Sequence, residues 1–252
     1  VTLTATNAGG TGNATLALVV SHTRILGLSG NLAFGNTILS QSAQRVLGIS
    51  NSGSGNLTVT GITYPAGFSG NWSGTIAPGT TQNVTVSFTP TAVQSYGGNV
   101  VVSSNATSGS SRLSVGGNGI ALTRILALSG NLAFGNATVN QTTPRTFSIT
   151  NTGNGNLTVT GITYPAGFSG NWSGTIAPGA TQNVTVSFTP TAVQSYSGNL
   201  TVNSNATSGG TTLPVTGRGV PLPPVITSGL SANGTVGAAF SYQVTASNNA
   251  TS

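Results

Sequence analysis

The sequence predicts an all-β protein made of tandem Ig-like β-sandwiches, two of them complete, with partial β-sandwich segments at both ends. The first reason is an internal repeat: residues 24–119 return as residues 124–219, with about three-quarters of the positions unchanged. Within it, residues 56–96 return as residues 156–196 with a single change. The second reason is that each repeat contains about seven short apolar or alternating runs separated by turn residues, which is typical of an Ig-like sandwich. The third is that no window shows the 3.6-residue apolar period of a capped helix, so we expect almost no helix.

Residues 1–20 are expected to form the C-terminal hairpin of a partial Ig-like domain. Apolar and polar residues alternate over residues 1–6, turn-forming residues occupy 7–12, and a second apolar run covers 15–20. A single hairpin is marginal in water, so this one needs further strands against which to pack.

The first repeat is expected to contain the strands of one complete sandwich. These strands cover residues 25–28, 32–34, 45–50, 57–65, 71–76, 83–88, 99–103 and 111–115. Gly61 interrupts the alternation of its strand and indicates a bulge. Pro78 and Gly79 suit the central positions of a type II turn, because proline presets φ and glycine accepts a positive φ. The second repeat, residues 124–219, is expected to reproduce these elements.

Residues 223–252 are expected to open a further, partial β domain. The prolines in residues 220–224 predict a stiff, extended spacer before it. Strands are expected at residues 225–227 and 240–246, where apolar residues alternate with polar ones.

The composition leaves few residues for catalytic or metal-binding chemistry. The 252 residues include no Asp, Glu or Cys, and one His. Paired carboxylates for acid–base catalysis, a Ser–His–Asp triad and a carboxylate calcium site are therefore excluded, and one His is too few for a zinc site. We expect no enzyme activity, no cofactor and no metal, and we expect His22 to be an exposed linker residue.

The net charge of +6 comes from arginines scattered singly along the chain. They are Arg24, Arg45, Arg112, Arg124, Arg145 and Arg218. A nucleic-acid-binding surface needs clustered basic residues, so we expect no nucleic-acid partner. No stretch approaches the roughly 20 apolar residues of a membrane-spanning helix, so we expect no membrane insertion. Because so few charges give little repulsion between copies, the composition favours a polymer or matrix component.

Two kinds of residue indicate contact with carbohydrate. Trp72 and Trp172 are candidates for stacking on sugar rings, and the alternative is that they pack in the core or at a domain interface. Asn-x-Ser/Thr sequences occur throughout the chain, and we expect glycosylation at four of them. These four are Asn71, Asn105, Asn171 and Asn205. Attached glycan would keep a nearly uncharged surface hydrated.

Several motifs of the first repeat return 100 residues later. They are Leu32-Ala-Phe-Gly35, Ile49-Ser-Asn51 (as Ile149-Thr-Asn151), Gly53 with Gly55-Asn56-Leu57, Phe68-Ser-Gly70 with Trp72, Ile76-Ala-Pro-Gly79 and Val84-Thr-Val-Ser-Phe-Thr-Pro90. A unit with these motifs resembles the ASH/Hydin-type Ig-like repeats of the bacterial surface proteins called choice-of-anchor D. The resemblance covers about three-quarters of the chain. It implies a modular spacer in large secreted proteins, with no catalytic residues.

The two ends carry motifs that look like opposite halves of one domain type. These motifs are Pro223-Pro-Val-Ile-Thr-Ser228, Gly234-Thr-Val-Gly-Ala-Ala-Phe-Ser-Tyr-Gln-Val244 and Val1-Thr-Leu-Thr-Ala-Thr-Asn-Ala-Gly-Gly10. The first two are similar to the beginning of the putative Ig (He-PIG-like) domain of bacterial surface repeats, and the third to its final hairpin. The middle of that domain is absent, so each end is expected to present an unpaired edge.

One interpretation is that the ends of neighbouring copies complete each other. The C-terminal segment of one copy would pack with the N-terminal hairpin of the next, and this head-to-tail contact would build a filament. The residues expected in these intersubunit strands are Val1, Leu3, Ala5, Leu16, Leu18, Val225, Phe240, Tyr242 and Val244. The alternative is that the sequence is a window of a longer repetitive chain.

The sequence thus predicts an extracellular or cell-surface structural protein, a filament subunit whose partner is a further copy of itself. The alternative function is an adhesin stalk whose Ig-like modules bind glycan through Trp72 and Trp172.

Overall fold

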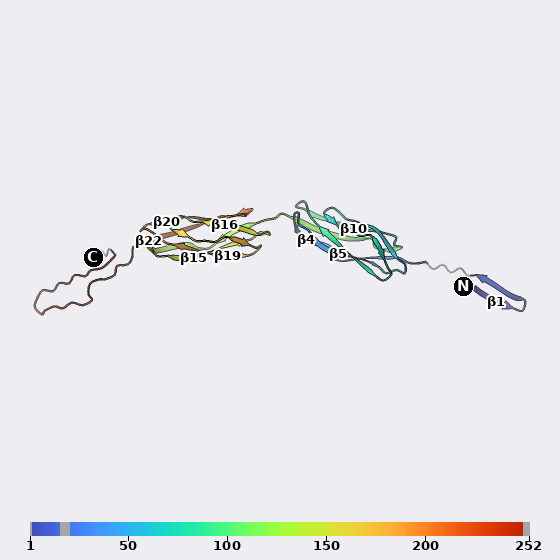
Figure 1. Ribbon diagram of the computed structural model, residues 1–252, viewed down its shortest axis with the longest axis horizontal. Helices are drawn as coiled ribbons and strands as arrows, with labels where there is room; N and C mark the ends of the chain where they lie inside the picture. The colour runs from blue at the N-terminus through green and yellow to red at the C-terminus, as the bar shows by residue number, and fades with distance from the viewer. Residues whose placement is uncertain (1, 16–20, 249–252) are drawn as a thin grey trace. The chain divides into compact units, whose positions relative to one another are not determined.

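The computed structural model describes residues 2–15 and 21–248, and these residues form strands, turns and bends but no helix. The predicted all-β fold class is therefore confirmed. By its internal contacts the chain divides into two units, Val1–Ala121 and Leu122–Ser252, and each contains one complete sandwich (Figure 1).

The first module, residues 24–119, consists of two five-stranded sheets packed face to face. One sheet contains, in order across it, β4 (Ala33–Ile38), β12 (Arg112–Ile120), β10 (Ser95–Ser104), β6 (Leu57–Thr63) and β8 (Gly74–Ile76). The other contains β11 (Ser108–Gly109), β3 (Ile25–Ser29), β5 (Ala43–Asn51), β9 (Thr81–Phe88) and β7 (Phe68–Ser69).

Alternation along the strands places one row of side chains in the core of this module. In β9, Val84, Val86 and Phe88 are buried, while Asn83 and Thr85 are exposed and Ser87 is half-buried. Each apolar side chain buried in this way stabilises the fold by about 1.5–3 kcal/mol. The core residues are Leu26, Leu32, Phe34, Leu47, Ile49, Leu57, Val59, Phe68, Ile76, Val84, Val86, Phe88, Tyr96, Val100, Val102 and Val115.

A cluster of aromatic rings lies at the centre of this core. The Phe88 ring centroid is 4.7 Å from that of Phe68, 5.6 Å from that of Phe34 and 5.3 Å from that of Tyr96. The Tyr96 hydroxyl accepts hydrogen bonds from the backbone N–H groups of Thr91 and Ala92, at 3.1 and 2.9 Å. A tyrosine bonded to the backbone just upstream is a hallmark of Ig-like sandwiches.

Two turn details predicted from the sequence are confirmed. The Thr80 N–H donates to the Ala77 carbonyl at 3.2 Å and Gly79 has a φ of 75°, as a type II turn requires. The β6–β10 ladder shifts register next to Gly61, which pairs with Ser103 while Val59 pairs with Ser104. This shift is the bulge expected from Gly61.

The second module, residues 124–219, repeats the first. One sheet contains β14 (Leu132–Thr138), β22 (Thr212–Val220), β20 (Ser195–Ser204), β16 (Leu157–Thr163) and β18 (Gly174–Ile176). The other contains β17 (Phe168–Ser169), β19 (Thr181–Phe188), β15 (Thr143–Asn151), β13 (Ile125–Ser129) and β21 (Ser208–Gly209). Its core repeats the aromatic cluster, with the Phe168 and Phe188 centroids 4.8 Å apart.

The N-terminal hairpin is present, but with a different second strand from the one predicted. β1 (Thr2–Asn7) pairs with β2 (Gly10–Thr15) in antiparallel fashion, from Asn7 opposite Gly10 to Thr2 opposite Thr15. The two-residue loop at positions 8–9 is the shortest that joins such strands, so pairing starts earlier than the predicted turn over 7–12 allows. The expected strand residues Leu16 and Leu18, like Val1, lie outside the described residues.

The C-terminal segment departs furthest from the prediction, because the expected strands at 225–227 and 240–246 do not form. Ile226 and Ala246 make an isolated antiparallel bridge, and the other residues of 223–248 form turns, bends and irregular chain. A strand persists when its backbone groups are paired on a ladder, and one bridge supplies too few partners.

A smaller difference concerns the expected strand at 71–76, of which Gly74–Ile76 forms β8. Gly74 has a φ of 157°, and a Cβ on it would lie 3.1 Å from the Trp72 ring. Trp72 therefore lies before the strand, with its ring against Gly74, and is not part of the ladder.

Candidate functional site

The C-terminal segment carries a row of exposed apolar side chains. Phe240, Tyr242 and Val244 are 57%, 41% and 63% exposed, and they alternate along the chain. Val225 and Ile226 are exposed as well. Alternate residues of an extended chain point to the same side. The segment therefore has the sequence pattern of a strand with one apolar face, and among the described residues these side chains are only partly covered.

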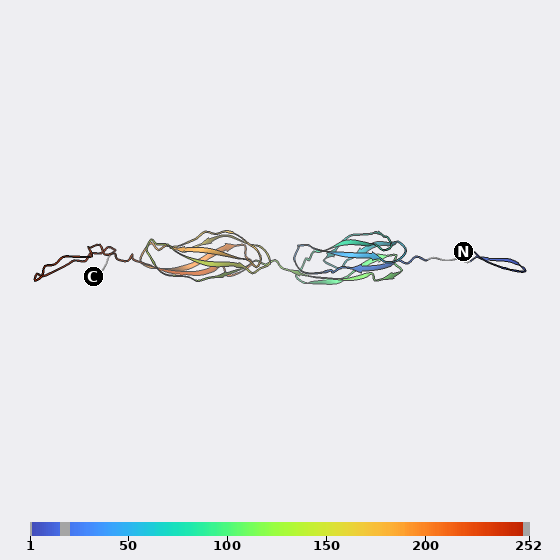
Figure 2. The same cartoon turned by 90° about the horizontal axis from the view of Figure 1, so that it is seen from below.

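Hydrogen bonds hold the base of this segment. The Thr227 N–H donates to the Thr245 carbonyl and the Ser247 N–H to the Val225 carbonyl, each at 2.8 Å. Nearer its middle, the Tyr242 hydroxyl donates to the Gly229 carbonyl. In Figures 1 and 2 the segment is accordingly an open loop without strand arrows.

The N-terminal hairpin forms a separate two-stranded sheet. Its strands β1 and β2 pair with each other, and no other described strand continues the sheet on either side. Leu3 and Ala5, two of the residues expected at a subunit contact, lie on β1. Among the described strands, none pairs with the outer edge of β1 or of β2, and an open strand edge is the usual template for strand addition.

Trp72 and Trp172, the candidates for glycan stacking, are half-buried. Each packs against the core of its own module, and its ring lies over Gly74 or Gly174. A Cβ at this glycine would lie 3.1–3.2 Å from the ring, so a larger residue would require the indole to shift. Each indole is thus partly covered by its own module, and sugar stacking on its exposed part stays a prediction.

The four candidate glycosylation residues are all exposed, but they fall into two groups. For Asn71 and Asn171 no side-chain hydrogen bond is described in the structure. The side-chain oxygens of Asn105 and Asn205 accept hydrogen bonds from the N–H groups of Thr58 and Thr158, each at 2.9 Å. The second pair therefore has a structural role that does not require glycan.

Thr107, the third residue of this Asn-x-Thr sequence, also makes hydrogen bonds. The Thr107 hydroxyl accepts from the Arg24 N–H at 2.9 Å and donates to the Arg24 carbonyl at 3.1 Å. The Arg24 side chain, through Nε, donates to the Asn105 carbonyl at 2.8 Å. The Asn-x-Thr pattern here fastens the start of β3 to the loop after β10.

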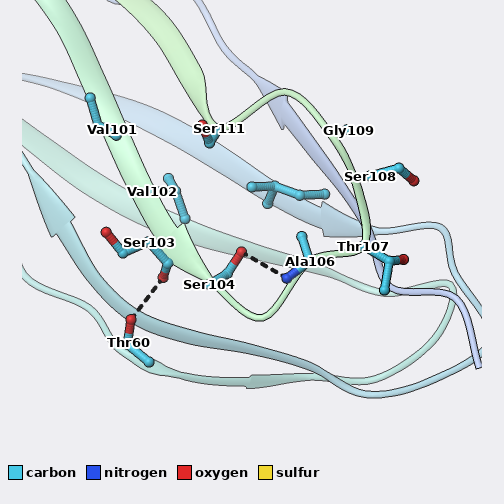
Figure 3. A pocket seen from close by; sticks show the side chains of 11 residues that line it. Thr60, Val101, Val102, Ser103, Ser104, Ala106, Thr107, Ser108, Gly109 and Ser111 are labelled. Atoms are coloured by element: carbon cyan, nitrogen blue, oxygen red, sulfur yellow. Dashed lines mark hydrogen bonds between the residues drawn. The ribbon is translucent and has the colours of Figure 1, made fainter.

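A groove that sequence reasoning missed lies beside this loop in the first module (Figure 3). It has a volume of about 590 Å³ and is lined mainly by hydroxyl-bearing and small side chains, among them Thr60, Ser103, Ser104 and Ser111. Two contacts in it are internal: Thr60 donates to the Ser103 carbonyl at 3.2 Å, and the Ser104 hydroxyl accepts from the Ala106 N–H at 3.4 Å. No titratable side chain lines the groove, so its walls offer no acid–base chemistry.

Three further features were sought in the described part of the chain: a metal site, a membrane-spanning helix and contacts of the arginines. There, no group of three His, Cys, Asp or Glu residues lies close enough to hold a metal ion. No helix among those residues is long and apolar enough to span a membrane. Arg45 and Arg145 lie 5.8 Å from the ring centroids of Phe34 and Phe134, which is the range of a cation–π contact.

The family model for HYDIN/CFA65/VesB-like, Ig-like domains matches residues 25–118 and again residues 125–218. Together the two matches cover most of the chain. The chain belongs to this family. The ASH/Hydin-type resemblance and the tandem Ig-like sandwiches inferred from the sequence are thereby confirmed, whereas membership of choice-of-anchor D proteins stays a prediction.

Three solved structures illustrate what else the chain is similar to. A protein of unknown function from Porphyromonas gingivalis W83 is 16% identical, with a TM-score of 0.33, over 77% of this chain and 99% of that one. The ASH/PapD-like domain 7 of human CEP192 is 15% identical, with a TM-score of 0.32, over 39% and 87%. The Vibrio cholerae VesB protease is 24% identical, with a TM-score of 0.28, over 37% and 30%.

A comparison with curated proteins gave no match. All three TM-scores are below 0.5. The family assignment therefore rests on the two matches to the family model.

Proposed function

We propose that this member of the HYDIN/CFA65/VesB-like Ig-like family is an extracellular structural protein, a filament subunit whose copies join head to tail by β-strand complementation. The two complete modules serve as spacers, and the terminal segments form the joints. The extracellular setting belongs to the proposal; it is supported by the resemblance to bacterial surface repeats and by the 2% content of charged residues.

The observation that carries the proposal is the uncovered apolar row of Phe240, Tyr242 and Val244. Full burial of such a side chain is worth about 1.5–3 kcal/mol, and these three are about half exposed, so a strand that covered them would gain roughly 2–4 kcal/mol in total. Contiguous exposed apolar side chains of this kind usually mark an interaction site.

The N-terminal hairpin of a second copy is the occupant that we propose for this face. As an isolated two-stranded sheet it is marginal in water, so it too gains from further strands. It offers open strand edges, and the C-terminal segment supplies backbone with few ladder partners. Because the two surfaces differ, the contact is heterologous and continues from copy to copy as a filament.

A competing peptide tests this function. We expect the full chain to sediment as a series of oligomers that grows with concentration. An excess of a peptide with the sequence of residues 223–252 should occupy the hairpin and shorten the series. A control peptide carrying Phe240→Ser and Val244→Ser should leave the series unchanged, since it lacks the apolar row.

Two outcomes count against the proposal. A chain that stays monomeric at every concentration does not use its ends as joints between copies. Equal activity of the two peptides would mean that the apolar row is not what the hairpin recognises.

A further inference from the structure

In both modules, the first and the last strand of one sheet lie side by side and run in the same direction. In the first module β4 pairs with β12, with Ala33 opposite Gly116 and Ile38 opposite Ile120. In the second, β14 pairs with β22, from Leu132 opposite Val215 to Thr138 opposite Val220. The main pairings between the other strands of each sandwich are antiparallel, except for the two-residue contacts of β3 with β11 and of β13 with β21.

Each parallel ladder carries a bulge. Phe34 and Gly35 lie opposite one residue of β12, because the pairing passes from Ala33–Gly116 to Asn36–Asn118. Gly35 has a φ of 67°, a conformation that glycine adopts without strain. In the second module the corresponding Gly135 has a φ of 69°. A bulge fixes the register of the two strands, so they resist sliding by one residue.

Further hydrogen bonds extend the ladder at both of its ends. At one end the Gly116 N–H donates to the Leu32 carbonyl at 3.2 Å, and at the other the Leu39 N–H donates to the Ile120 carbonyl at 3.0 Å. Between them the Asn118 side chain donates to the Asn36 side-chain oxygen at 3.3 Å. In the second module the Val139 N–H donates to the Val220 carbonyl at 2.9 Å.

We propose that the β4–β12 and β14–β22 ladders are mechanical clamps that carry tension along the chain. The N-terminal side of the chain pulls at the start of β4, next to Gly116, and the C-terminal side pulls at the end of β12, next to Ile38. Because the strands are parallel, these two pulls slide them past each other. Sliding strains all the hydrogen bonds of the ladder at once, whereas peeling breaks them one after another.

Strand β3 comes before the clamp in the path of the force. It lies in the other sheet, where Leu26 pairs with Asn51 and Ser29 with Gly48. The chain crosses between the sheets at Gly30, which has a φ of 118°. Since β3 and β4 belong to different sheets, losing β3 leaves the β4–β12 ladder as the next element to bear the force.

The path through each module is compatible with this role. Figures 1 and 2 both show the strands running along the length of a module, with the chain entering at one end and leaving at the other. The clamps act within a single chain, so they are tested separately from the assembly of copies.

Pulling one module in two directions tests the clamp. The chain has no cysteine, so introduced cysteines give unique handles on the full chain. The pair Ser21→Cys and Ala121→Cys stretches the first module from its two ends and shears β4 against β12. The pair Gln41→Cys and Ala121→Cys pulls at neighbouring ends of the same strands and peels them apart.

Unfolding forces are compared at one pulling speed, because forced unfolding is governed by the unfolding rate. Only ruptures that release roughly 300 Å of chain, the length expected for one extended module, are counted. We expect the shearing force to be several-fold higher than the peeling force. Equal forces in the two directions would overturn the proposal, since the thermodynamic stability of the module is the same whichever direction it is pulled in.

A proline substitution tests the ladder itself. Leu39 precedes Ser40, whose φ is 63°, in a turn closed by the Gln41 N–H donating to the Ile38 carbonyl at 3.0 Å. Proline is favoured at this position of a type II turn, so Leu39→Pro removes the N–H donor to Ile120 and keeps the turn. We expect it to lower the shearing force of the first module.

The second module supplies the matched control. Val139→Pro makes the same change there, and it should leave the force unchanged while the handles at 21 and 121 are used. When the handles are at residues 121 and 221, Val139→Pro should lower the shearing force and Leu39→Pro should leave it unchanged. The clamp would also be contradicted if Leu39→Pro unfolded in denaturant like the unaltered chain and kept its full shearing force. If the variant does not fold, the comparison of the two pulling directions still tests the clamp, because it uses no proline.

Discussion

Among the single residues, the amide of Asn51 shows how a chain without carboxylates fastens its turns. Asn51 ends β5 and is 1% exposed. Its side-chain Nδ2 donates to the carbonyls of Gly55 and Ile76, at 2.8 and 3.0 Å, and its Oδ1 accepts from the Gly53 N–H at 3.0 Å. Asn151 makes the same three bonds in the second module. The position needs two donors and one acceptor, which an amide provides and a carboxylate does not.

Replacing this amide should therefore be costly even when the shape is kept. We expect Asn51→Asp to lower the free energy of unfolding by about 3 kcal/mol or more at pH 7, because it sets a buried charge against two carbonyls. Denaturant titration measures the loss. The loss should shrink toward pH 3, where the carboxyl is protonated, and an Asn51→Asp protein as stable as the original would contradict the assignment of the two donors.

The two tyrosines of each module predict opposite results for the same substitution. The Tyr64 hydroxyl is buried and has no hydrogen-bond partner among the residues that the structure describes, whereas the Tyr96 hydroxyl accepts from two backbone N–H groups. Tyr64→Phe should leave stability unchanged or raise it by about 1 kcal/mol, and Tyr96→Phe should lower it by about 1–3 kcal/mol. Denaturant unfolding of both variants decides this; a clear loss for Tyr64→Phe would show that its hydroxyl is bonded in solution.

Tyr64 also predicts how the stability of the fold responds to alkaline pH. Burial raises the pKa of Tyr64, and likewise of Tyr164, above the ordinary value of 10.0. The fold therefore favours the neutral phenol, and this contribution is present below about pH 10 and lost as the pH rises through the pKa of the folded state. The double variant Tyr64→Phe, Tyr164→Phe should lose less stability above pH 10 than the original. Tyr96 and Tyr196, whose pKa values are lowered by hydrogen bonds, first of all from the side chains of Thr91 and Thr191, are present in both proteins and do not affect the difference.

At the scale of strands, the alternation of apolar and polar residues predicted those features that neighbouring residues determine. The buried row Val84, Val86 and Phe88 of β9 and the bulge at Gly61 follow from residues that are neighbours in the chain. The two-residue strands β7 and β11 were missed, because two residues show no period. The parallel β4–β12 pairing was missed as well, since its partners are about 80 residues apart and no periodicity links them.

The terminal elements mark a different limit. The alternation of Phe240, Tyr242 and Val244 is real, but in the structure no strand forms there. Alternation predicts a strand with one buried face, and whether the strand forms depends on a neighbour that local sequence does not name. For the candidate site, the sequence therefore pointed to the residues, and the structure added that their apolar face is uncovered.

At the scale of the whole molecule, the charge composition governs how copies can associate. The chain has six arginines and neither Asp nor Glu. Side-chain ion pairs between copies are therefore impossible, and the cohesion that we propose comes from apolar burial and backbone hydrogen bonds. The same composition gives every copy a net charge of +6, so the electrostatic force between copies is a weak repulsion.

These facts predict an unusual dependence on salt and pH for the assembled protein. Salt screens the repulsion between positive copies, and excluded salts such as sulfate strengthen apolar burial, so raising the salt concentration should leave association unchanged or strengthen it. Between about pH 3 and pH 6, where side-chain carboxylates would titrate, association should stay nearly constant because the chain has none. Sedimentation of the full chain across a salt series and a pH series measures both. Oligomers that fall apart at high salt would mean that charge holds the copies together, and the apolar row would then no longer explain the joint.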